Sequence, residues 1–264
     1  MKQILITGST DGIGKLAAIK LAKAGHKLYL HGRSEEKFAK TIEEVKEASG
    51  NESISGFIAD FSDLSAVMKM ADQVNDELDT LDVLINNAGV YNSPEHANGQ
   101  GLDMRMVVNY LAPFVLTKAL LPLCKKGDAR IINVSSAAQA PVDPDVLAGS
   151  KRAATQSTYA QSKLALTMWS MHLAGTEKDT TVIAVNPGSL LRTKMVMEAF
   201  GNSWSSADKG ADILYDLALS DDYRDASGRY YDNDTDGFNQ AHPDAYDENK
   251  IDRLMRETKD IISG

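Results

Sequence analysis

The stretch Thr7-Gly8-Ser9-Thr10-Asp11-Gly12-Ile13-Gly14 decides the fold of this chain. A strand-like segment at 3–7, with an apolar run at 4–6, leads into it, and residues with helical spacing follow it. Glycine allows a tight turn and a close approach of the backbone to a phosphate, and the first turn of a helix offers N–H groups and a positive dipole end to an anion. We therefore predict a strand, a turn and a helix that together bind a phosphate group, although glycines also mark purely structural turns.

The rest of the chain repeats this strand-and-helix unit. Short apolar runs lie at 4–6, 27–30, 54–58, 83–85, 130–134 and 182–185, and a last edge strand is expected at 229–231. Helical spacing follows the first three runs, and further helices are expected at 102–121, 157–173, 207–219 and 250–262. Such runs are typical of parallel strands that are buried on both faces. The expected fold class is α/β, with one doubly wound parallel sheet of about seven strands and helices on both faces.

The domain organisation follows from the same pattern. No linker rich in Pro, Gly or Ser divides the chain, so we expect residues 1–264 to form a single domain. Ligands of a doubly wound sheet bind beyond the carboxyl ends of its strands. We expect substrate loops at about 189–206 and 232–249.

The composition is that of an ordinary soluble protein, with 43% hydrophobic and 25% charged residues. The net charge of −9 repels phosphate backbones and anionic lipid, so we expect no nucleic-acid or membrane partner. Cys124 is the only cysteine, which excludes an intramolecular disulfide and argues against a cysteine-based zinc site, and no metal is expected. Neither a secretory signal nor a run of 18 apolar residues is visible, so we expect a cytoplasmic protein.

Tyr159 and Lys163 stand four residues apart on an expected helix, which puts both side chains on one face. A tyrosine can protonate a carbonyl oxygen during reduction, but its ordinary pKa of about 10 is too high for a base near neutrality. A nearby ammonium group is expected to favour the phenolate and so lower that pKa. Ser135-Ser136 follows the run at 130–134, where a hydroxyl can polarise a carbonyl group. Each of these patterns alone is more often a solvated helix face or a turn.

Together the motifs resemble the short-chain dehydrogenase/reductase family. The turn has the family's Thr-Gly-x-x-x-Gly-x-Gly spacing, Asn86-Asn87-Ala88-Gly89 closes the fourth run, and Tyr-x-x-x-Lys follows the fifth. The resemblance covers nearly the whole chain and implies a Rossmann fold. It also implies an oxidoreductase that transfers a hydride between a nicotinamide cofactor and a carbonyl or alcohol of a small organic substrate. The segments 98–102 and 227–231 resemble the retinol-dehydrogenase-like branch.

The resemblance assigns a catalytic tetrad of Asn109, Ser136, Tyr159 and Lys163, with Ser135 as the alternative to Ser136. In this assignment Asn109 holds a water that links the lysine to solvent, and Lys163 also binds the nicotinamide ribose. Asp60-Phe61 is implied to contact the adenine. The cofactor-binding residues expected in all are Gly8, Ser9, Thr10, Gly12, Ile13, Gly14, Arg33, Asp60, Phe61, Asn87, Ala88, Gly89, Tyr159, Lys163, Pro187, Gly188 and Thr193.

The end of the second run favours NADP(H) over NAD(H). A carboxylate there would bind the ribose 2′-hydroxyl of NAD, but Gly32 stands at about that place. Arg33 follows it, and a guanidinium suits a 2′-phosphate, although it is also compatible with a solvated surface residue. Lys15 either adds positive charge at this end or points to solvent.

The segment after the sixth run, Asn186-Pro187-Gly188, departs from the family pattern. Four residues separate Gly188 from Thr193, where the family has three before the threonine that binds the nicotinamide carboxamide. Thr193 is the expected contact, and Ser189 is the alternative. Met195, Met197 and Phe200 either line a substrate pocket or belong to the core.

Other features remain open or are discounted. The stretch 232–237 resembles the start of a calcium loop, but Pro243 occupies the position that needs a bidentate glutamate, so we expect an acidic surface turn.

The family resemblance implies a homodimer or homotetramer that pairs through the helices carrying Asn109 and Tyr159. A cofactor-sensing regulator without meaningful catalysis is the alternative function. Nucleotide-sugar epimerisation or dehydration is a third, and the short C-terminal region argues against it.

Overall fold

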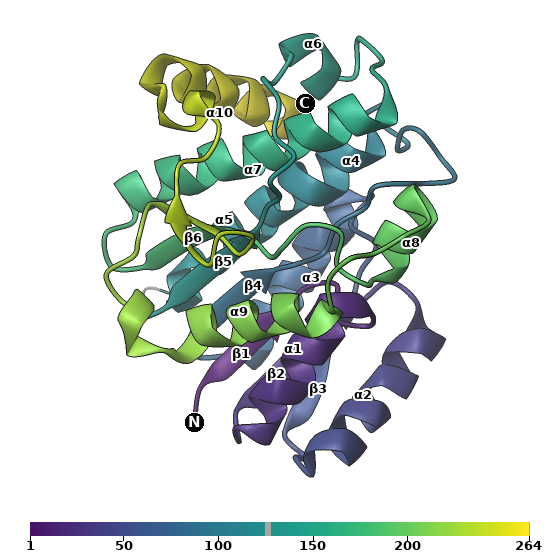
Figure 1. The fold of residues 1–264 in the computed structure, drawn as a ribbon, viewed down its shortest axis with the longest axis vertical. Coiled ribbons are helices and arrows are strands. Elements are labelled where there is room, and N and C mark those ends of the chain that lie inside the picture. Colours follow the sequence, from purple (N-terminus) through teal and green to yellow (C-terminus); the bar gives the residue numbers. More distant parts are fainter. Residues whose placement is uncertain (125–127, 264) are drawn as a thin grey trace.

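A twisted sheet runs through the molecule with helices on both of its faces (Figure 1). The computed structural model describes residues 1–124 and 128–263. In this part of the chain the sheet has eight strands in the order β3-β2-β1-β4-β5-β6-β7-β8, parallel except for β8. The strands are β1 (Gln3–Ile6), β2 (Lys27–Gly32), β3 (Ile54–Ile58), β4 (Val83–Asn86), β5 (Arg130–Val134), β6 (Thr181–Asn186), β7 (Arg229–Asp232) and β8 (Gly237–Asn239). The predicted doubly wound α/β class is confirmed.

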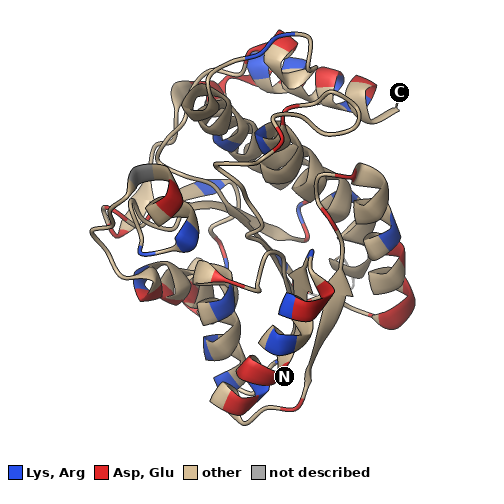
Figure 2. Ribbon diagram, turned by 90° about the vertical axis from the view of Figure 1, so that its right-hand side faces the viewer, with Lys and Arg blue, Asp and Glu red and all other residues tan. Residues whose placement is uncertain are grey.

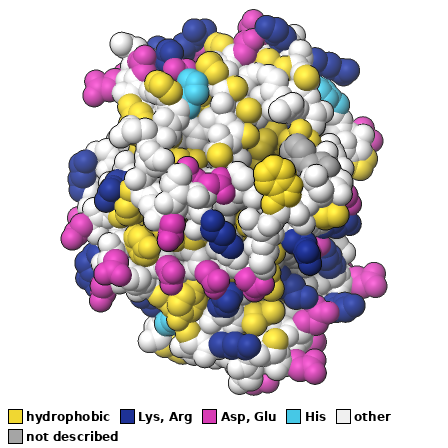
Figure 3. Space-filling view, viewed as in Figure 1, with side chains coloured by type: hydrophobic (Ala, Val, Ile, Leu, Met, Phe, Trp, Pro, Cys, Tyr) yellow, Lys and Arg dark blue, Asp and Glu magenta, His cyan; other side chains and the backbone are white. Residues whose placement is uncertain are grey.

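The helices and helical turns connect these strands and cover the sheet. They are α1 (Gly12–Lys23), α2 (Glu35–Ser49), α3 (Leu64–Glu77), α4 (Met104–Met106), η1 (Val107–Leu111), α5 (Ala112–Cys124), α6 (Pro144–Leu147), α7 (Thr155–Thr176), α8 (Lys194–Phe200), α9 (Ala207–Leu219), η2 (Asp221–Tyr223), η3 (Pro243–Tyr246) and α10 (Glu248–Ser263). Most of the acidic and basic residues lie on helices around the sheet (Figure 2), and side chains of both signs are interspersed on the face that Figure 3 shows.

Two apolar cores form because successive strand residues point to opposite faces. Ile4 and Ile6 of β1 join the core beneath α1 and α9, whereas Leu5 joins the core beneath α3, α5 and α7. All three side chains are fully buried. The strand therefore reads as a continuous apolar run, as expected for a parallel strand that is covered on both faces.

The strand count differs from the prediction because β7 is not the edge strand. The turn after Asp232 sends the chain back, and Phe238 of β8 packs against Tyr231 with ring centroids 5.3 Å apart. The guanidinium of Arg229 lies 3.7 Å from the centroid of the Phe238 ring. The predicted acidic surface turn at 232–237 is the connection of this hairpin.

The predicted helix at 102–121 is interrupted. Residues 107–111 form one π-helical turn, η1, which contains Asn109. Periodicity does not reveal this turn, because residues 107–117 are buried on every side and so show no apolar face whose phase could shift. Such π-turns often occur at functional sites. The whole segment Met104–Cys124 is long and apolar enough to cross a membrane, but most of it is buried in the protein core.

Helix α10 packs over α7 (Figure 1), and Tyr110 of the π-turn contacts α10 as well. Ile251, Leu254 and Met255 of α10 are buried in the same core as α7. The hydroxyl of Tyr110 lies 2.6 Å from that of Thr258, within a buried contact. Because residues 161–170 of α7 are all buried over nearly three turns, this part of α7 is covered on every side.

Candidate active site

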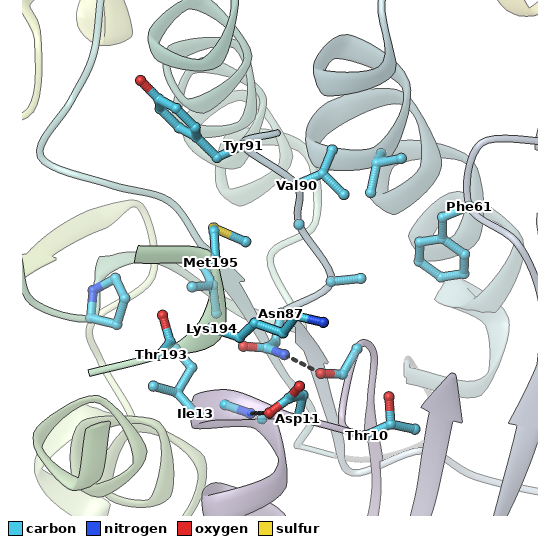
Figure 4. A pocket seen from close by; sticks show the side chains of 18 of the residues that line it. Thr10, Asp11, Ile13, Phe61, Asn87, Val90, Tyr91, Thr193, Lys194 and Met195 are labelled. Carbon is cyan, nitrogen blue, oxygen red and sulfur yellow. Dashed lines mark hydrogen bonds between the residues drawn. The ribbon is translucent and has the colours of Figure 1, made fainter. Parts of the chain in front are cut away.

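A cleft opens at the carboxyl ends of β1, β2, β4, β5 and β6 (Figure 4). Its lining includes most of the predicted cofactor residues: Gly8, Thr10, Gly12, Ile13, Gly14, Arg33, Asp60, Phe61, Asn87, Ala88, Gly89, Tyr159, Lys163, Pro187, Gly188 and Thr193. These residues come from segments that are far apart in the sequence. The parallel sheet brings them together because each lies just beyond the end of a strand.

Two glycines allow the first turn to pack against the end of β4. Gly8 has a φ of +64°, and a Cβ atom there would lie 2.6 Å from Ala88 Cα. A Cβ atom on Gly14 would lie 2.4 Å from Asn87 Nδ2, which donates hydrogen bonds to Thr7 O at 2.8 Å and to Gly8 O at 2.9 Å. The glycine turn and the Asn87 segment are therefore one hydrogen-bonded unit.

The start of α1 faces the cleft. Asp11 caps this helix by accepting a hydrogen bond from Gly12 N at 2.8 Å. A Cβ atom on Gly12 would lie 3.6 Å from Thr193 Cγ2, so a side chain there would narrow the gap between the turn and residue 193 (Figure 4). The first-turn amides of a helix have no acceptor within it. The gap and these amides suit the phosphates of a dinucleotide.

Ser9 is an exception among the predicted cofactor residues. Its side chain is fully buried beneath the turn and does not line the cleft. The hydroxyl donates to Ile6 O at 2.9 Å and accepts from His31 N at 2.9 Å. The side chain therefore joins β1 to β2 and is unavailable to a ligand.

His31 is a residue of the site that the sequence reasoning missed. Its Nδ1 accepts from Gly8 N at 3.0 Å, and its Nε2 lies 3.0 Å from Ala59 O. The ring stacks on Phe61 with centroids 4.1 Å apart. Burial lowers the pKa of His31 to about 4, with the Ala59 carbonyl opposing the shift. The imidazole is thus neutral and ties the glycine turn to the ends of β2 and β3.

Positive charge gathers at the β2 end of the cleft. Arg33 and Lys37 both line it, and Lys37 Nζ lies 2.9 Å from Asp11 Oδ2. A Cβ atom on Gly32 would lie 2.5 Å from Thr10 Cγ2, so an acidic side chain could not be placed there without a shift of Thr10. Lys15, which the sequence left open, pairs with Glu44 at 2.5 Å and is not among the lining residues.

Tyr159 and Lys163 of α7 lie together at the other end of the cleft. Lys163 Nζ lies 5.7 Å from the centroid of the Tyr159 ring and donates a hydrogen bond to Val134 O at 2.7 Å. Burial lowers the pKa of Lys163 to about 8. Tyr91, another residue that the sequence reasoning missed, packs on the Tyr159 ring with centroids 5.0 Å apart.

The expected lowering of the tyrosine pKa is not found. Burial raises the pKa of Tyr159 above its ordinary value; the Ser136 side chain opposes this shift, and Tyr91 adds to it. The prediction was wrong here because desolvation of the phenolate outweighs the favourable contacts.

The structure separates the roles of the two serines. The Ser135 hydroxyl is buried, donates to Lys163 O at 3.0 Å and lies 2.7 Å from the Thr167 hydroxyl. Ser136 is only partly buried, and a hydrogen bond from its side chain opposes the rise in the pKa of Tyr159. Ser136 is therefore the serine that is placed to meet a ligand.

Asn109 does not line the cleft, and its amide group is already engaged. Its Oδ1 accepts from Val90 N at 2.7 Å, and its Nδ2 donates to Val90 O at 3.0 Å and to Ser162 Oγ at 3.0 Å. The side chain thus holds the segment after β4 against α7. A Cβ atom on Gly89 would lie 3.3 Å from Asn109 Oδ1 and 3.6 Å from Lys163 Nζ, so the two residues lie on the same side of Gly89 and the water-holding role stays a prediction.

The segment between Gly188 and Thr193 has one residue more than the family pattern. Within it Leu190 adopts the left-handed conformation, with a φ of +48°. Thr193 lines the cleft, and its hydroxyl caps α8 by accepting from Val196 N at 3.3 Å. Ser189 is not among the lining residues of the cleft, and its hydroxyl donates to Asp234 Oδ2 at 2.5 Å. This geometry favours Thr193 over Ser189.

Helix α8 forms one wall of the cleft (Figure 4). Met195 lines the cleft, whereas Met197 is 43% exposed and belongs neither to the lining nor to the core. The side chain of Phe200 lies outside the described part of the structure. Among the described residues, none from 232–249 lines the cleft, so the second predicted substrate loop does not reach it here.

Comparison with known proteins agrees with this arrangement. The profile of the short chain dehydrogenase family matches residues 2–203, which hold the glycine turn, Ser136, Tyr159 and Lys163. The chain belongs to the short-chain dehydrogenase family. This short-chain dehydrogenase is accordingly an oxidoreductase with a nucleotide-binding Rossmann fold.

Individual relatives are similar over most of their length. Retinol dehydrogenase 13 from Homo sapiens is 31% identical over 284 residues, which span 99% of this chain and 84% of the relative. A short chain dehydrogenase from Escherichia coli CFT073, solved in complex with NADPH, has a TM-score of 0.73 and 29% identity, and the match covers 88% of this chain and 96% of that chain. One from Shigella flexneri 2a, in complex with NADP, has a TM-score of 0.70, 31% identity and the same two coverages. The predicted resemblance to retinol dehydrogenases is confirmed.

Proposed function

We propose that this short-chain dehydrogenase transfers a hydride between NADP(H) and a carbonyl or alcohol group of a small organic substrate. One observation carries the proposal. Tyr159, Lys163 and Ser136 converge at one end of the cleft whose other end is formed by the glycine turn and the start of α1.

Tyr159, Lys163 and Ser136 define the reacting end of the cleft, and the position of each supports a role in the reaction. The Tyr159 hydroxyl protonates the substrate oxygen, and its raised pKa keeps it protonated as this acid requires. The Ser136 hydroxyl holds the same oxygen. Lys163, buried and bonded to Val134 O, is placed to orient the nicotinamide ribose and to pass on a proton. A bound nicotinamide would supply the hydride.

The preference for NADP(H) rests on charge at the β2 end of the cleft. Arg33 and Lys37 offer two cations to a 2′-phosphate, and Gly32 leaves no carboxylate to bind a free 2′-hydroxyl. The NADPH and NADP complexes of two structural relatives agree with this preference.

The substrate wall is apolar and partly aromatic. Val90, Tyr91 and Met195 line this wall of the cleft, and Figure 4 labels all three. These side chains favour a substrate whose carbon skeleton beside the reacting group is apolar. The loop 189–206, which carries Leu191 and Met195, is the proposed substrate loop.

A substrate screen tests the proposal. Purified protein is mixed with aliphatic and aromatic aldehydes, ketones and alcohols, each with NADPH or NADP and, in parallel, with NADH or NAD. The absorbance of the reduced nicotinamide reports turnover. We expect turnover of apolar carbonyl compounds with a higher kcat/KM for NADPH. Binding of NADPH without turnover of any compound would instead favour a cofactor-sensing regulator.

If the chain forms a homo-oligomer, we propose that residues 161–170 of α7 are not part of the contact between subunits. Helix α10 of the same chain already packs on α7, and its Thr258 contacts Tyr110 of the segment that carries Asn109. A second subunit could reach the part of α7 beneath α10 only if α10 left its site.

A further inference from the structure

The acidic turn 232–237, between β7 and β8, contacts the segment 186–193 that forms one wall of the cleft. Asn233 Nδ2 donates to Pro187 O at 2.8 Å, and Asn233 N donates to Asn186 O at 3.1 Å. Asn186 Nδ2 in turn donates to Asp232 Oδ1 at 2.8 Å. The turn is thus bonded to the start of the segment through both backbone and side chains.

The Asp234 carboxylate makes the most extensive of these contacts. Its Oδ1 accepts from Ser189 N at 2.8 Å, and its Oδ2 accepts from Ser189 Oγ at 2.5 Å and from Asn186 Nδ2 at 2.9 Å. Both oxygens are used, and all three donors lie on one short segment. Hydrogen bonds to an ionised carboxylate are shorter and about twice as strong as neutral ones.

The segment needs such support because it contains a strained residue. Leu190 directly follows Ser189 and has a φ of +48°, which costs roughly 1–2 kcal/mol in a residue with a Cβ atom. Such a conformation persists only where the surroundings hold it. On the far side of Leu190, its carbonyl accepts from Trp204 N at 3.0 Å, and the chain reaches Thr193 beside the glycine turn.

We propose that Asp234 is a positioning residue that fixes segment 186–193 and thereby sets the distance between Thr193 and the glycine turn. The inference rests on the proposed function, since that distance matters for the nicotinamide half of a bound dinucleotide. Asp234 itself does not line the cleft, so it acts through Ser189 and Asn186. Arg33 and Phe61, which would hold the adenosine half, lie on other segments of the cleft and make no contact with Asp234 in the hydrogen bonds of this turn.

The test compares two ligands that differ in the nicotinamide half. Titration calorimetry measures the Kd of NADPH and of adenosine 2′,5′-bisphosphate for the full-length chain and for Asp234→Ala. We expect the Kd of NADPH to rise roughly tenfold, as expected for the loss of about one charged hydrogen bond, while that of the bisphosphate stays within about twofold. Asp234→Asn keeps the volume and one acceptor, so it should give a smaller change of the same kind.

Asp236→Asn is the matched control. Asp236 lies in the same turn and carries the same charge, but its Oδ1 accepts from the Tyr231 hydroxyl at 3.0 Å and not from segment 186–193. Both Kd values should stay at the wild-type level. Ser189→Ala should weaken NADPH binding less than Asp234→Ala, and the double variant should be no worse than Asp234→Ala alone, because both changes remove the same contacts.

Each outcome separates the inference from the proposed function. Equal losses for both ligands in Asp234→Ala and Asp234→Asn would show a general structural role and overturn the inference, as would no loss for either. If the wild-type chain binds neither NADPH nor NADH, the proposed function itself fails.

Discussion

Gly8 N donates a hydrogen bond to His31 Nδ1 at 3.0 Å, and the other ring nitrogen of His31 lies 3.0 Å from Ala59 O. The amide is a donor and the carbonyl an acceptor, so only the neutral imidazole with its proton on Nε2 satisfies both. A protonated ring would leave the Gly8 amide facing a second donor. The glycine turn therefore depends on the charge state of a buried histidine.

Stability should fall in mild acid for this reason. The unfolded histidine takes up a proton near pH 6.5, whereas the folded one resists until about pH 4. The free energy of unfolding therefore decreases as the pH drops through this window, by up to about 3 kcal/mol from this group. Urea unfolding at several pH values measures the slope. In His31→Gln the free energy of unfolding should decrease less between pH 6.5 and pH 4. The same pH dependence in wild type and variant would contradict the role given to His31.

Tyr159→Phe should abolish most turnover. The ring that packs against Tyr91 remains, but the proton donor is gone, so we expect kcat to fall by at least about 100-fold. The Kd of NADPH should change by less than about twofold, because the phenyl ring preserves packing in the cleft. Tyr215→Phe, on α9 across the sheet, is the control and should keep wild-type turnover. Comparable kcat values for wild type and Tyr159→Phe would rule out the proposed acid.

Arg33→Ala and Lys37→Ala should each weaken NADPH binding roughly tenfold and leave NADH binding nearly unchanged, because a single charged hydrogen bond to the 2′-phosphate is lost. The effect should shrink at high salt. Lys15→Ala removes a neighbouring cation that is paired with Glu44 and should alter neither affinity. If the affinities for NADPH and NADH fall by the same factor, these cations do not bind the 2′-phosphate.

Asn109→Ala should destabilise the fold rather than merely slow the reaction. It leaves Val90 N, Val90 O and Ser162 Oγ without the partners they have in the structure, at a cost of roughly 2–3 kcal/mol in chemical denaturation. Asn92→Ala loses only an exposed 3.4 Å bond to Glu198 O and should cost less than about 0.5 kcal/mol. A cost for Asn109→Ala as small as that of Asn92→Ala would show that the Val90 contacts contribute little.

The molar mass in solution should not depend on α7. Met171 and His172 are only half-buried on this helix, and Met171→Glu with His172→Glu should leave the mass measured by light scattering unchanged. The reason is that α10 already packs on α7 within the same chain. Dissociation of a wild-type oligomer into monomers in this variant would place the subunit contact on α7 after all.

Much of the fold was predictable from local pattern. The runs at 4–6, 54–58 and 130–134 became strands with nearly the expected bounds, because a strand covered on both faces must be apolar throughout. The helix expected at 207–219 has those bounds. The π-turn around Asn109 was not predictable because the helix is buried on every side there, and the strand β8 was not predictable because its three residues are too few to show an alternating pattern.

The sequence by itself determined the glycine turn, the Tyr159–Lys163 spacing and hence the family, because each of these signals lies within a few neighbouring residues. Only the tertiary structure decided that His31 is neutral and that the Ser135 hydroxyl is engaged by Lys163 O and Thr167, which leaves Ser136 as the serine beside Tyr159. The tertiary structure also places Asp234 within hydrogen-bond distance of Ser189, 45 residues away along the chain. These outcomes depend on burial and on hydrogen bonds between distant segments, which the spacing of residues along one chain does not encode.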